Sequence, residues 1–302
     1  MSHPKQSLRW IAAACVPLLF VCVAALQAEI DARTRTAAQE KDELLLSSPS
    51  AVRKISLGYD ALLADLYWTR AVQYYGSRVG TDHPNFELLW PLLNISTTLD
   101  PKLVIAYHFG AIFLSETGKG GAGRTDLAIK LVRRGIAANP NQWALGSDLG
   151  FLYYWRMRDY PNSAAAYLEA SKIPNAPLWL KMMAARVAQK GGSLETSRMI
   201  WSQLYESTQN RLVRKRAEEM LRGLKAQADE TQLNELASEY RKRFGRFPSS
   251  AAELRDAGLL RGIPTDPDGF PYTFGPDGKS ELDPQSSVVI PPEIKGPPTP
   301  VK

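Results

Sequence analysis

One glycine-rich stretch has the outline of a phosphate-binding loop. Residues 118–125 read Gly-Lys-Gly-Gly-Ala-Gly-Arg-Thr, close to the pattern G-x-x-x-x-G-K-[ST], whose backbone amides and lysine hold nucleotide phosphates. That chemistry needs a lysine before the final hydroxyl residue and a buried strand before the glycines. Arg124 replaces the lysine, and residues 106–116 have the spacing of a helix. The sequence therefore predicts an inter-helix insertion, with no nucleotide and no other cofactor.

Side chains suited to catalysis or metal binding are few and scattered. The histidines are His3, His83 and His108, too few and too far apart for a histidine metal site. Both cysteines lie in an apolar run near the amino terminus. No nucleophile has a base and an orienting group beside it. We therefore expect no catalytic residue, no metal site and no enzymatic activity.

The carboxy-terminal region contains four aspartates in glycine- and proline-rich sequence. Carboxylates gathered in this way are suited to calcium. The segments Asp266-Pro267-Asp268-Gly269 and Pro276-Asp277-Gly278 are also ordinary turn sequences. Turns are the favoured interpretation, and calcium binding through Asp266, Asp268, Asp277 and Asp283 remains the alternative.

The elements that position these residues form a repeat. Apolar spacing predicts four pairs of helices: residues 59–75 with 86–99, 101–116 with 126–138, 142–155 with 162–171, and 178–190 with 193–206. Gly110, Gly150 and Ala185 stand at equivalent positions, where a small side chain lets two helices cross closely. The period of about 34 residues is that of the tetratricopeptide repeat.

Residues 101–206 therefore resemble three tetratricopeptide repeats, and residues 56–100 resemble a weaker fourth. The sequence departs from the family by the insertion at 118–123, by one extra residue in the turn at 158–162, and by Gly146 where the family often has tryptophan. The resemblance implies an α-solenoid, which binds protein partners more often than it performs chemistry.

The repeat register places several large side chains on the concave side of the solenoid. Aromatic residues and arginine are common interface hot spots, so we expect a groove for an apolar or extended peptide. Its predicted residues are Tyr107, Leu114, Phe151, Tyr154, Trp155, Trp179, Met182, Arg186 and Lys190. In the alternative interpretation the aromatic residues pack beneath neighbouring helices.

An uncharged run from Trp10 to Leu26 follows Lys5 and Arg9. Its length is at the lower limit of the roughly 17–25 residues that span a bilayer. We interpret residues 1–28 as a signal anchor in a bacterial inner membrane, crossing once, with the body in the periplasm because short basic amino termini usually stay inside. A cleaved signal peptide that releases the body into the periplasm is the alternative.

After the anchor, residues 29–55 are interpreted as a linker, residues 56–206 as the repeats and residues 207–244 as one or two long helices that cap them. Residues 245–283 are rich in turn signals, and the Asp277-Gly278 turn predicts a small hairpin. Residues 233–283 resemble the carboxy-terminal module of type II secretion pseudopilins, without the pilin signal sequence joined to it. Residues 284–302 form a proline-rich tail.

The net charge of +6 and pI near 9.2 do not indicate nucleic-acid binding, because acidic residues are interleaved with the basic ones. The predicted fold is mostly α: a membrane helix, a tetratricopeptide-like solenoid and a small module with a short β-hairpin. The predicted function is a membrane-anchored scaffold that binds a protein partner in the cell envelope and supports complex assembly. The alternative is a component of a machine like those of type II secretion or type IV pili.

Overall fold

The computed structural model describes residues 23–27, 48–82 and 84–291. The chain divides into two units between Ile55 and Ser56. In the first unit, helix α2 (Pro49–Ile55) occupies the end of the segment interpreted above as a linker. Pro49 is its first residue, a position where the missing N–H of proline costs no helical hydrogen bond.

The apolar run Trp10–Leu26 lies outside the described residues except for its last four. Among the residues that are described, no helix has both the length and the apolar character needed to cross a membrane.

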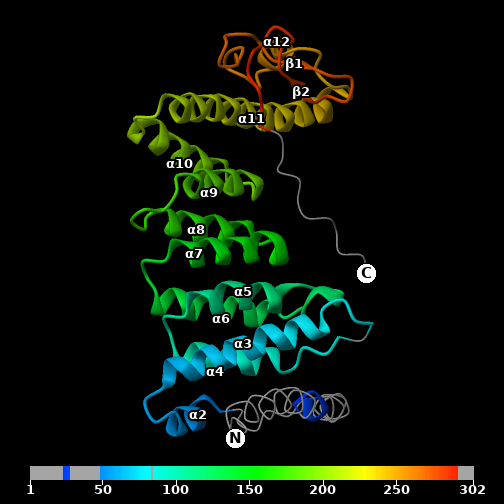
Figure 1. Ribbon diagram of the computed structural model, residues 1–302. Helices are drawn as coiled ribbons and strands as arrows, with labels where there is room; N and C mark the ends of the chain where they lie inside the picture. Colours follow the sequence, from blue (N-terminus) through cyan, green and yellow to red (C-terminus); the bar gives the residue numbers. More distant parts are fainter. Residues whose placement is uncertain (1–22, 28–47, 83, 292–302) are drawn as a thin grey trace, which may run out of the picture. The chain divides into compact units, whose positions relative to one another are not determined.

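The second unit is mostly helical, with one small two-stranded sheet, which confirms the coarse fold expected from the sequence. Figure 1 shows its helices stacked in consecutive pairs, with the long α11 across the last pair. The helices of the pairs are α3 (Asp60–Arg78), α4 (Leu89–Leu99), α5 (Val104–Ser115), α6 (Thr125–Ala138), α7 (Trp143–Phe151), α8 (Tyr160–Ser171), α9 (Trp179–Lys190) and α10 (Leu194–Ser207).

Glycines stand where helices of a pair cross closely. A Cβ atom on Gly110 of α5 would lie 2.9 Å from side-chain atoms of Leu93 and Leu131, and one on Gly150 would lie 2.9 Å from the Tyr167 ring. Contacts below 3.0 Å are too short for real Cβ atoms, so a larger residue at either position would force the neighbouring side chains to shift. The close crossings predicted at these two glycines are therefore confirmed.

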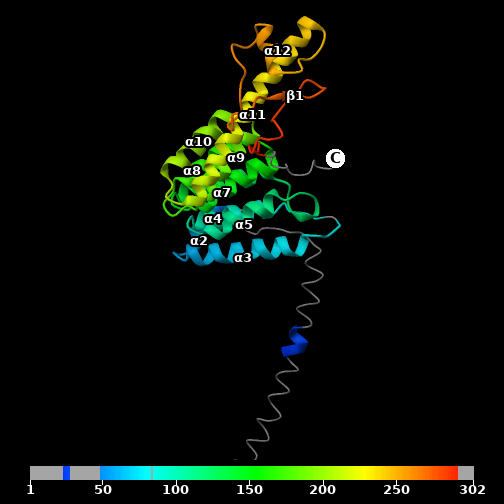
Figure 2. The same ribbon diagram turned by 90° about the horizontal axis from the view of Figure 1, so that it is seen from above.

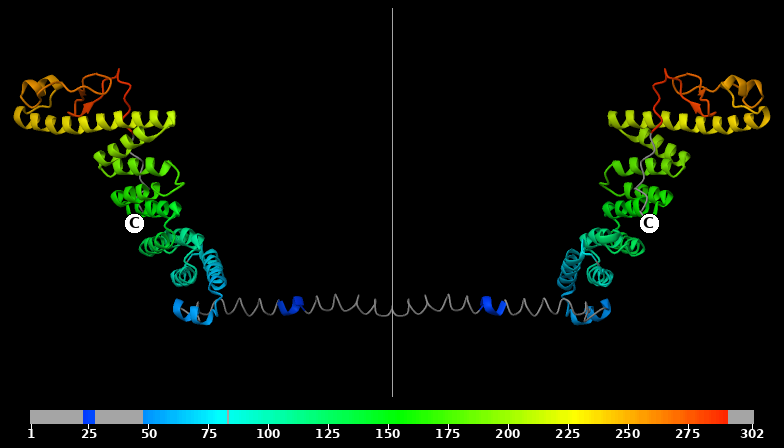
Figure 3. Two further views of the ribbon diagram at one scale, coloured as in Figure 1. Left: turned by 90° about the vertical axis from the view of Figure 1, so that its left-hand side faces the viewer. Right: turned by 90° about the vertical axis from the view of Figure 1, so that its right-hand side faces the viewer.

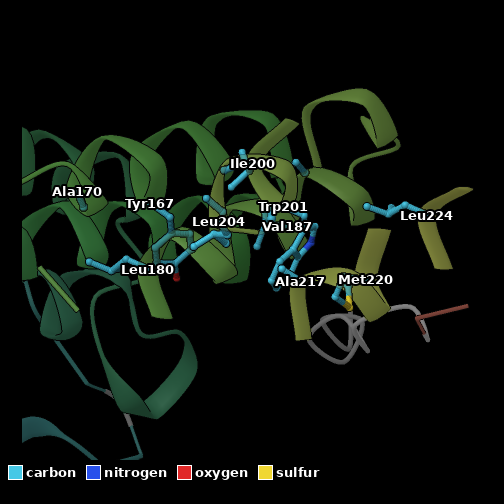
Figure 4. Close-up of a cluster of buried hydrophobic side chains, with 14 residues drawn as sticks. Tyr167, Ala170, Leu180, Val187, Ile200, Trp201, Leu204, Ala217, Met220 and Leu224 are labelled. Atoms are coloured by element: carbon cyan, nitrogen blue, oxygen red, sulfur yellow. The ribbon is translucent and has the colours of Figure 1, made fainter. Parts of the chain in front are cut away.

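The largest described core cluster joins α8, α9, α10 and α11. Trp201 of α10 is fully buried at its centre, among side chains that include Leu180 of α9 and Ala217 and Met220 of α11 (Figure 4). Helix α11 (Arg211–Phe244) thus covers the last helix pair. Leu212, in the first turn of α11, is exposed and lies outside this core cluster.

The carboxy-terminal half of α11 supports a small module (Figures 2 and 3). Leu233 and Tyr240 of α11 pack with Leu254 of α12 (Ala251–Asp256) and with Tyr272. Strands β1 (Thr273–Phe274) and β2 (Ser280–Glu281) pair antiparallel, with Thr273 opposite Glu281 and Phe274 opposite Ser280. The turn between them contains Gly278 at φ +78°, as the predicted Asp-Gly hairpin requires.

The aspartates of this module are engaged in turns and ion pairs. Asp266 is buried, and its Oδ1 accepts hydrogen bonds from the backbone N–H groups of Asp268 and Phe270, both at 2.9 Å. Asp268 pairs with Arg222 and accepts from Ser287. These contacts favour the turn interpretation over a calcium site, since the oxygens already have partners.

We expect the stability of the module at acid pH to depend on Glu253. Its carboxylate accepts hydrogen bonds from Tyr240 Oη at 2.9 Å, from Arg246 Nη1 at 2.7 Å and from Ser249 Oγ. The bonds from Ser249, Arg246 and Tyr240, in that order, lower the pKa of Glu253 from 4.5 to about 2. The folded state therefore binds this proton more weakly than the unfolded chain, so the stabilisation is complete above the unfolded pKa of 4.5 and is lost as the pH falls towards 2.

Glu253→Gln should accordingly lower the thermal unfolding midpoint at neutral pH, and the difference from wild type should shrink as the pH falls through this window. Circular dichroism at a series of pH values measures it. Asp256→Asn is the control, because that exposed carboxylate pairs only with its neighbour Arg255 among the described contacts. A difference for Glu253→Gln that stays constant down to pH 2 would contradict this assignment.

Candidate partner-binding groove

A π-helical turn extends the first helix of the third pair. Helix α7 continues directly into η2 (Leu152–Met157), and the backbone N–H of Arg158 bonds to the carbonyl of Tyr153. Arg158 has φ +55°, in the left-handed region. A π turn takes one more residue than an α turn, and such turns are frequent at functional sites. The extra residue that the sequence placed in the turn 158–162 is therefore accommodated inside η2.

This extension presents two stacked aromatic rings to solvent. The rings of Phe151 and Trp155 lie 6.1 Å apart between centroids, with 10° between their planes. Their side chains are 46% and 37% exposed. In the free protein, exposure of these two apolar rings to water is unfavourable. Burial of the rings against another apolar surface would remove this free-energy cost.

Helix α5 supplies the second wall of the same surface. Ile105, Phe109 and Ile112 are exposed and follow one face of the helix at i, i+4 and i+7. His108 packs edge-on against Phe109, with 5.0 Å between ring centroids. We call this surface the α5–η2 groove and define it by Ile105, His108, Phe109, Ile112, Asp148, Phe151 and Trp155.

A cavity of about 210 Å³ lies between the two walls. Its lining residues are His108, Ala111, Ile112, Ser115, Glu116, Asp148, Phe151 and Leu152. Sites for whole small molecules are typically about 300–1,000 Å³. A cavity of this size is suited to a single side chain projecting from a larger ligand, which favours a peptide or protein over a metabolite.

One hydrogen-bonded pair and one ion pair border the cavity. His108 Nδ1 donates to Asp148 Oδ2 at 2.7 Å. Burial raises the pKa of the Asp148 carboxyl above its usual value, and the hydrogen bond from His108 partly offsets this. Arg156 of η2 forms an ion pair with Glu116 across the groove. The groove therefore combines an apolar floor with carboxylates able to accept hydrogen bonds from a ligand.

The structure divides the residues predicted from the repeat register. Phe151 and Trp155 line the groove, as described above. Tyr107 and Leu114 do not, because both are fully buried. The Tyr107 ring lies against Gly135, and its hydroxyl donates to the carbonyl of Thr97 at 3.2 Å. Leu114 borders a separate cavity beside the glycine-rich insertion. These two predicted residues are therefore buried away from the α5–η2 groove, and their contact with a partner stays a prediction.

The remaining predicted residues lie on or near α9, away from the cavity lining. Trp179 is exposed and meets Trp143 and Tyr167 edge-on, at 6.5 and 6.4 Å. Tyr154 and Met182 are half-buried against the core cluster of α8–α11. Arg186 is exposed, and the ammonium of Lys190 lies 5.4 Å from the Tyr160 ring centroid. The two sets are not brought together in one cavity.

Sequence reasoning missed the contribution of α5 to the groove. This helix is apolar on almost every side, so hydrophobic periodicity gives no indication of which face is buried. The repeat register placed Tyr107 and Leu114 outward, whereas Ile105, Phe109 and Ile112 are the exposed residues. The only sequence signal for this face is His108, a polar residue in an apolar helix.

The glycine-rich insertion has no phosphate-loop context. It follows helix α5 instead of a strand, and Arg124 pairs with Asp126. Tyr75 donates to the carbonyl of Gly120 at 2.7 Å, and the backbone N–H of Gly80 donates to that of Lys119 at 2.8 Å. The insertion therefore packs on the end of α3. Within the described ranges, no group of three or more His, Cys, Asp and Glu residues is arranged to hold a metal ion.

The chain matches no model of a known protein family, and no curated protein matches it at a significant level.

Proposed function

We propose that this protein is a membrane-anchored scaffold of tetratricopeptide-like repeats that binds a protein partner in the cell envelope through the α5–η2 groove. The main support is the exposed Phe151–Trp155 stack, whose Phe151 lines one cavity with Ile112 of α5. Contiguous exposed apolar surface of this kind marks interaction sites. A stack of helix pairs is also the type of framework that offers an extended binding face.

The groove favours a ligand with a specific pattern. One apolar side chain of the partner enters the cavity beside Ile112 and Phe151. A hydrogen-bond donor of the partner next to that side chain meets Asp148 or Glu116 at the rim. An extended segment and an amphipathic helix both meet this requirement, because each presents an apolar side chain next to polar ones.

The envelope location is supported by the sequence alone. The uncharged run Trp10–Leu26 is proposed to hold the chain in a bacterial inner membrane with the repeats in the periplasm. If the run is a cleaved signal instead, the repeats are released into the periplasm.

Purification of the tagged full chain from membranes, after crosslinking in the cell, tests this proposal. We expect the protein in the membrane fraction, crosslinked to an envelope protein. The ratio of the two proteins should be the same in repeated purifications. Recovery of the chain in the soluble fraction would disprove the anchor. A chain that remains in the membrane without any crosslinked partner would disprove the scaffold.

A second candidate is a component of a secretion or pilus-like machine. The module after α11 favours it: a glycine ends the long helix, a short helix follows, and a small hairpin with an Asp-Gly turn closes the module. This order resembles the pseudopilin module. Recovery of pilin-machinery subunits as the crosslinked partner would favour this second candidate over the general scaffold.

A further inference from the structure

The first helix of the array and the turn before it carry a second apolar surface, separate from the groove. Leu57, Tyr59, Leu62 and Leu66 are 86%, 68%, 57% and 56% exposed. We call these four residues the α3 patch. Leu57 also adopts a φ of +51°, a left-handed conformation that is unfavourable for a branched side chain. Within this unit the segment thus combines strain with exposed apolar area, and neither stabilises the fold.

The patch lies on the outer end of the array. At 100° per residue, Leu66 is on the side of α3 opposite Trp68. Trp68 stacks with Phe113 of the next pair, with 6.1 Å between ring centroids. The terminal units of helical arrays need a polar outer face in water. At the carboxy-terminal end α11 covers the last pair, whereas the amino-terminal end exposes leucine and tyrosine.

The length of the preceding chain indicates what meets this surface. Residues 28–56 separate the proposed anchor from the first residue of the α3 patch. About 30 residues span at most about 100 Å even when fully extended. An anchored chain therefore keeps the α3 patch close to the bilayer, which raises its effective concentration there.

The residue types agree with a lipid surface. Leucine and tyrosine are typical of protein segments that enter the membrane interface. Within the second unit, residues 56–78 contain two basic residues, Arg70 and Arg78, and two acidic ones, Asp60 and Asp65. This segment therefore has no net negative charge that would oppose contact with anionic headgroups.

We propose that the α3 patch docks onto the surface of the bilayer that holds the anchor, so that the array stands with its first helix on the membrane. This inference depends on the anchor of the proposed function. It is independent of the groove, whose residues lie on α5, α7 and η2.

Quenching by lipid-attached nitroxides tests the docking in the full chain. The protein, with Cys15 and Cys22 replaced by serine, is reconstituted into vesicles of phosphatidylethanolamine and phosphatidylglycerol. A fluorophore is attached at Thr69→Cys, which follows Leu62 and Leu66 by seven and three residues on α3, or at Gln203→Cys on α10 as the matched exposed control. We expect headgroup nitroxides to quench the label at position 69, with no quenching above background at position 203.

Variants of the patch separate docking from simple proximity. Leu62→Ser with Leu66→Ser should reduce quenching at position 69 to the level of position 203, without changing the circular dichroism spectrum. Met199→Ser with Tyr205→Ser, two exposed residues of α10, should leave the quenching unchanged.

Flotation of the vesicles in a density gradient shows whether the protein is bound to them. Equal background quenching at both labels, in protein that floats with the vesicles, would overturn the docking and leave the anchor intact. Energy transfer between labelled copies with no lipid quenching would likewise overturn it, in favour of self-association. Protein that does not float with vesicles would instead disprove the anchor.

Discussion

Replacing Trp201 by alanine should lower the free energy of unfolding by about 3–5 kcal/mol, the usual cost of deleting a large buried aromatic side chain. Trp201 is fully buried between α9, α10 and α11, so its loss opens a cavity where α11 covers the last helix pair. For a chain of this size the loss corresponds to a fall of roughly 6–20 °C in the unfolding midpoint. Urea unfolding followed by circular dichroism measures it.

Trp201→Phe is the matched control for that variant. The indole Nε1 is buried without a hydrogen-bond partner among the described residues, so removing this N–H sacrifices no bond and phenylalanine retains much of the ring contact. We expect a clearly smaller loss than for alanine. A Trp201→Ala protein within about 1 kcal/mol of wild type would show that α11 does not depend on this cluster.

The double variant Phe151→Ala with Trp155→Ala should nearly abolish binding of the partner. Hot-spot aromatic residues contribute at least about 2 kcal/mol each when truncated. This is a roughly 30-fold weaker affinity for one residue, and the effect of the pair is larger unless the two act as one unit. Both side chains are partly exposed, so the unfolding midpoint should change far less than with Trp201→Ala. Titration of the crosslinked partner, once purified, gives the two affinities.

Tyr205→Ala provides the control for groove specificity. Tyr205 is also an exposed aromatic residue, but it lies on α10, and its ring meets Arg214 at 6.0 Å instead of lining the groove. Its replacement should leave partner binding unchanged. Equal losses from Tyr205→Ala and from the groove variant would indicate a general effect of surface aromatic residues on the protein.

Local sequence signals predicted a helix well where residues at its own ends stop it. Helix α11 begins after Asn210, whose side chain accepts from the N–H of Leu212 at 2.9 Å, and ends at Gly245 with φ +73°. Asparagine before the first helical turn and glycine after the last are residue types that favour these two ends. The Asp-Gly hairpin could also be predicted from a local signal, because a glycine with positive φ forms its turn.

The parts that sequence did not predict depend on long-range contacts. Periodicity does not define a buried face in the apolar helix α5, so the exposed residues of the groove were assigned to the wrong positions. The π turn at η2 is a hydrogen-bond shift that composition does not reveal. Residues expected in a free tail instead pack on the body: Val288 is buried, and Ser286 and Ser287 donate to Asp266 and Asp268.

Site-specific photocrosslinking in the cell tests the groove most directly. A photoreactive amino acid is placed in the full chain at Phe109 or Trp155 within the groove, or at Tyr205 or Met199 on α10. We expect one crosslinked partner from both groove positions and none from either position on α10. Crosslinks from α10 with none from the groove would contradict the claim that the α5–η2 groove is the binding surface.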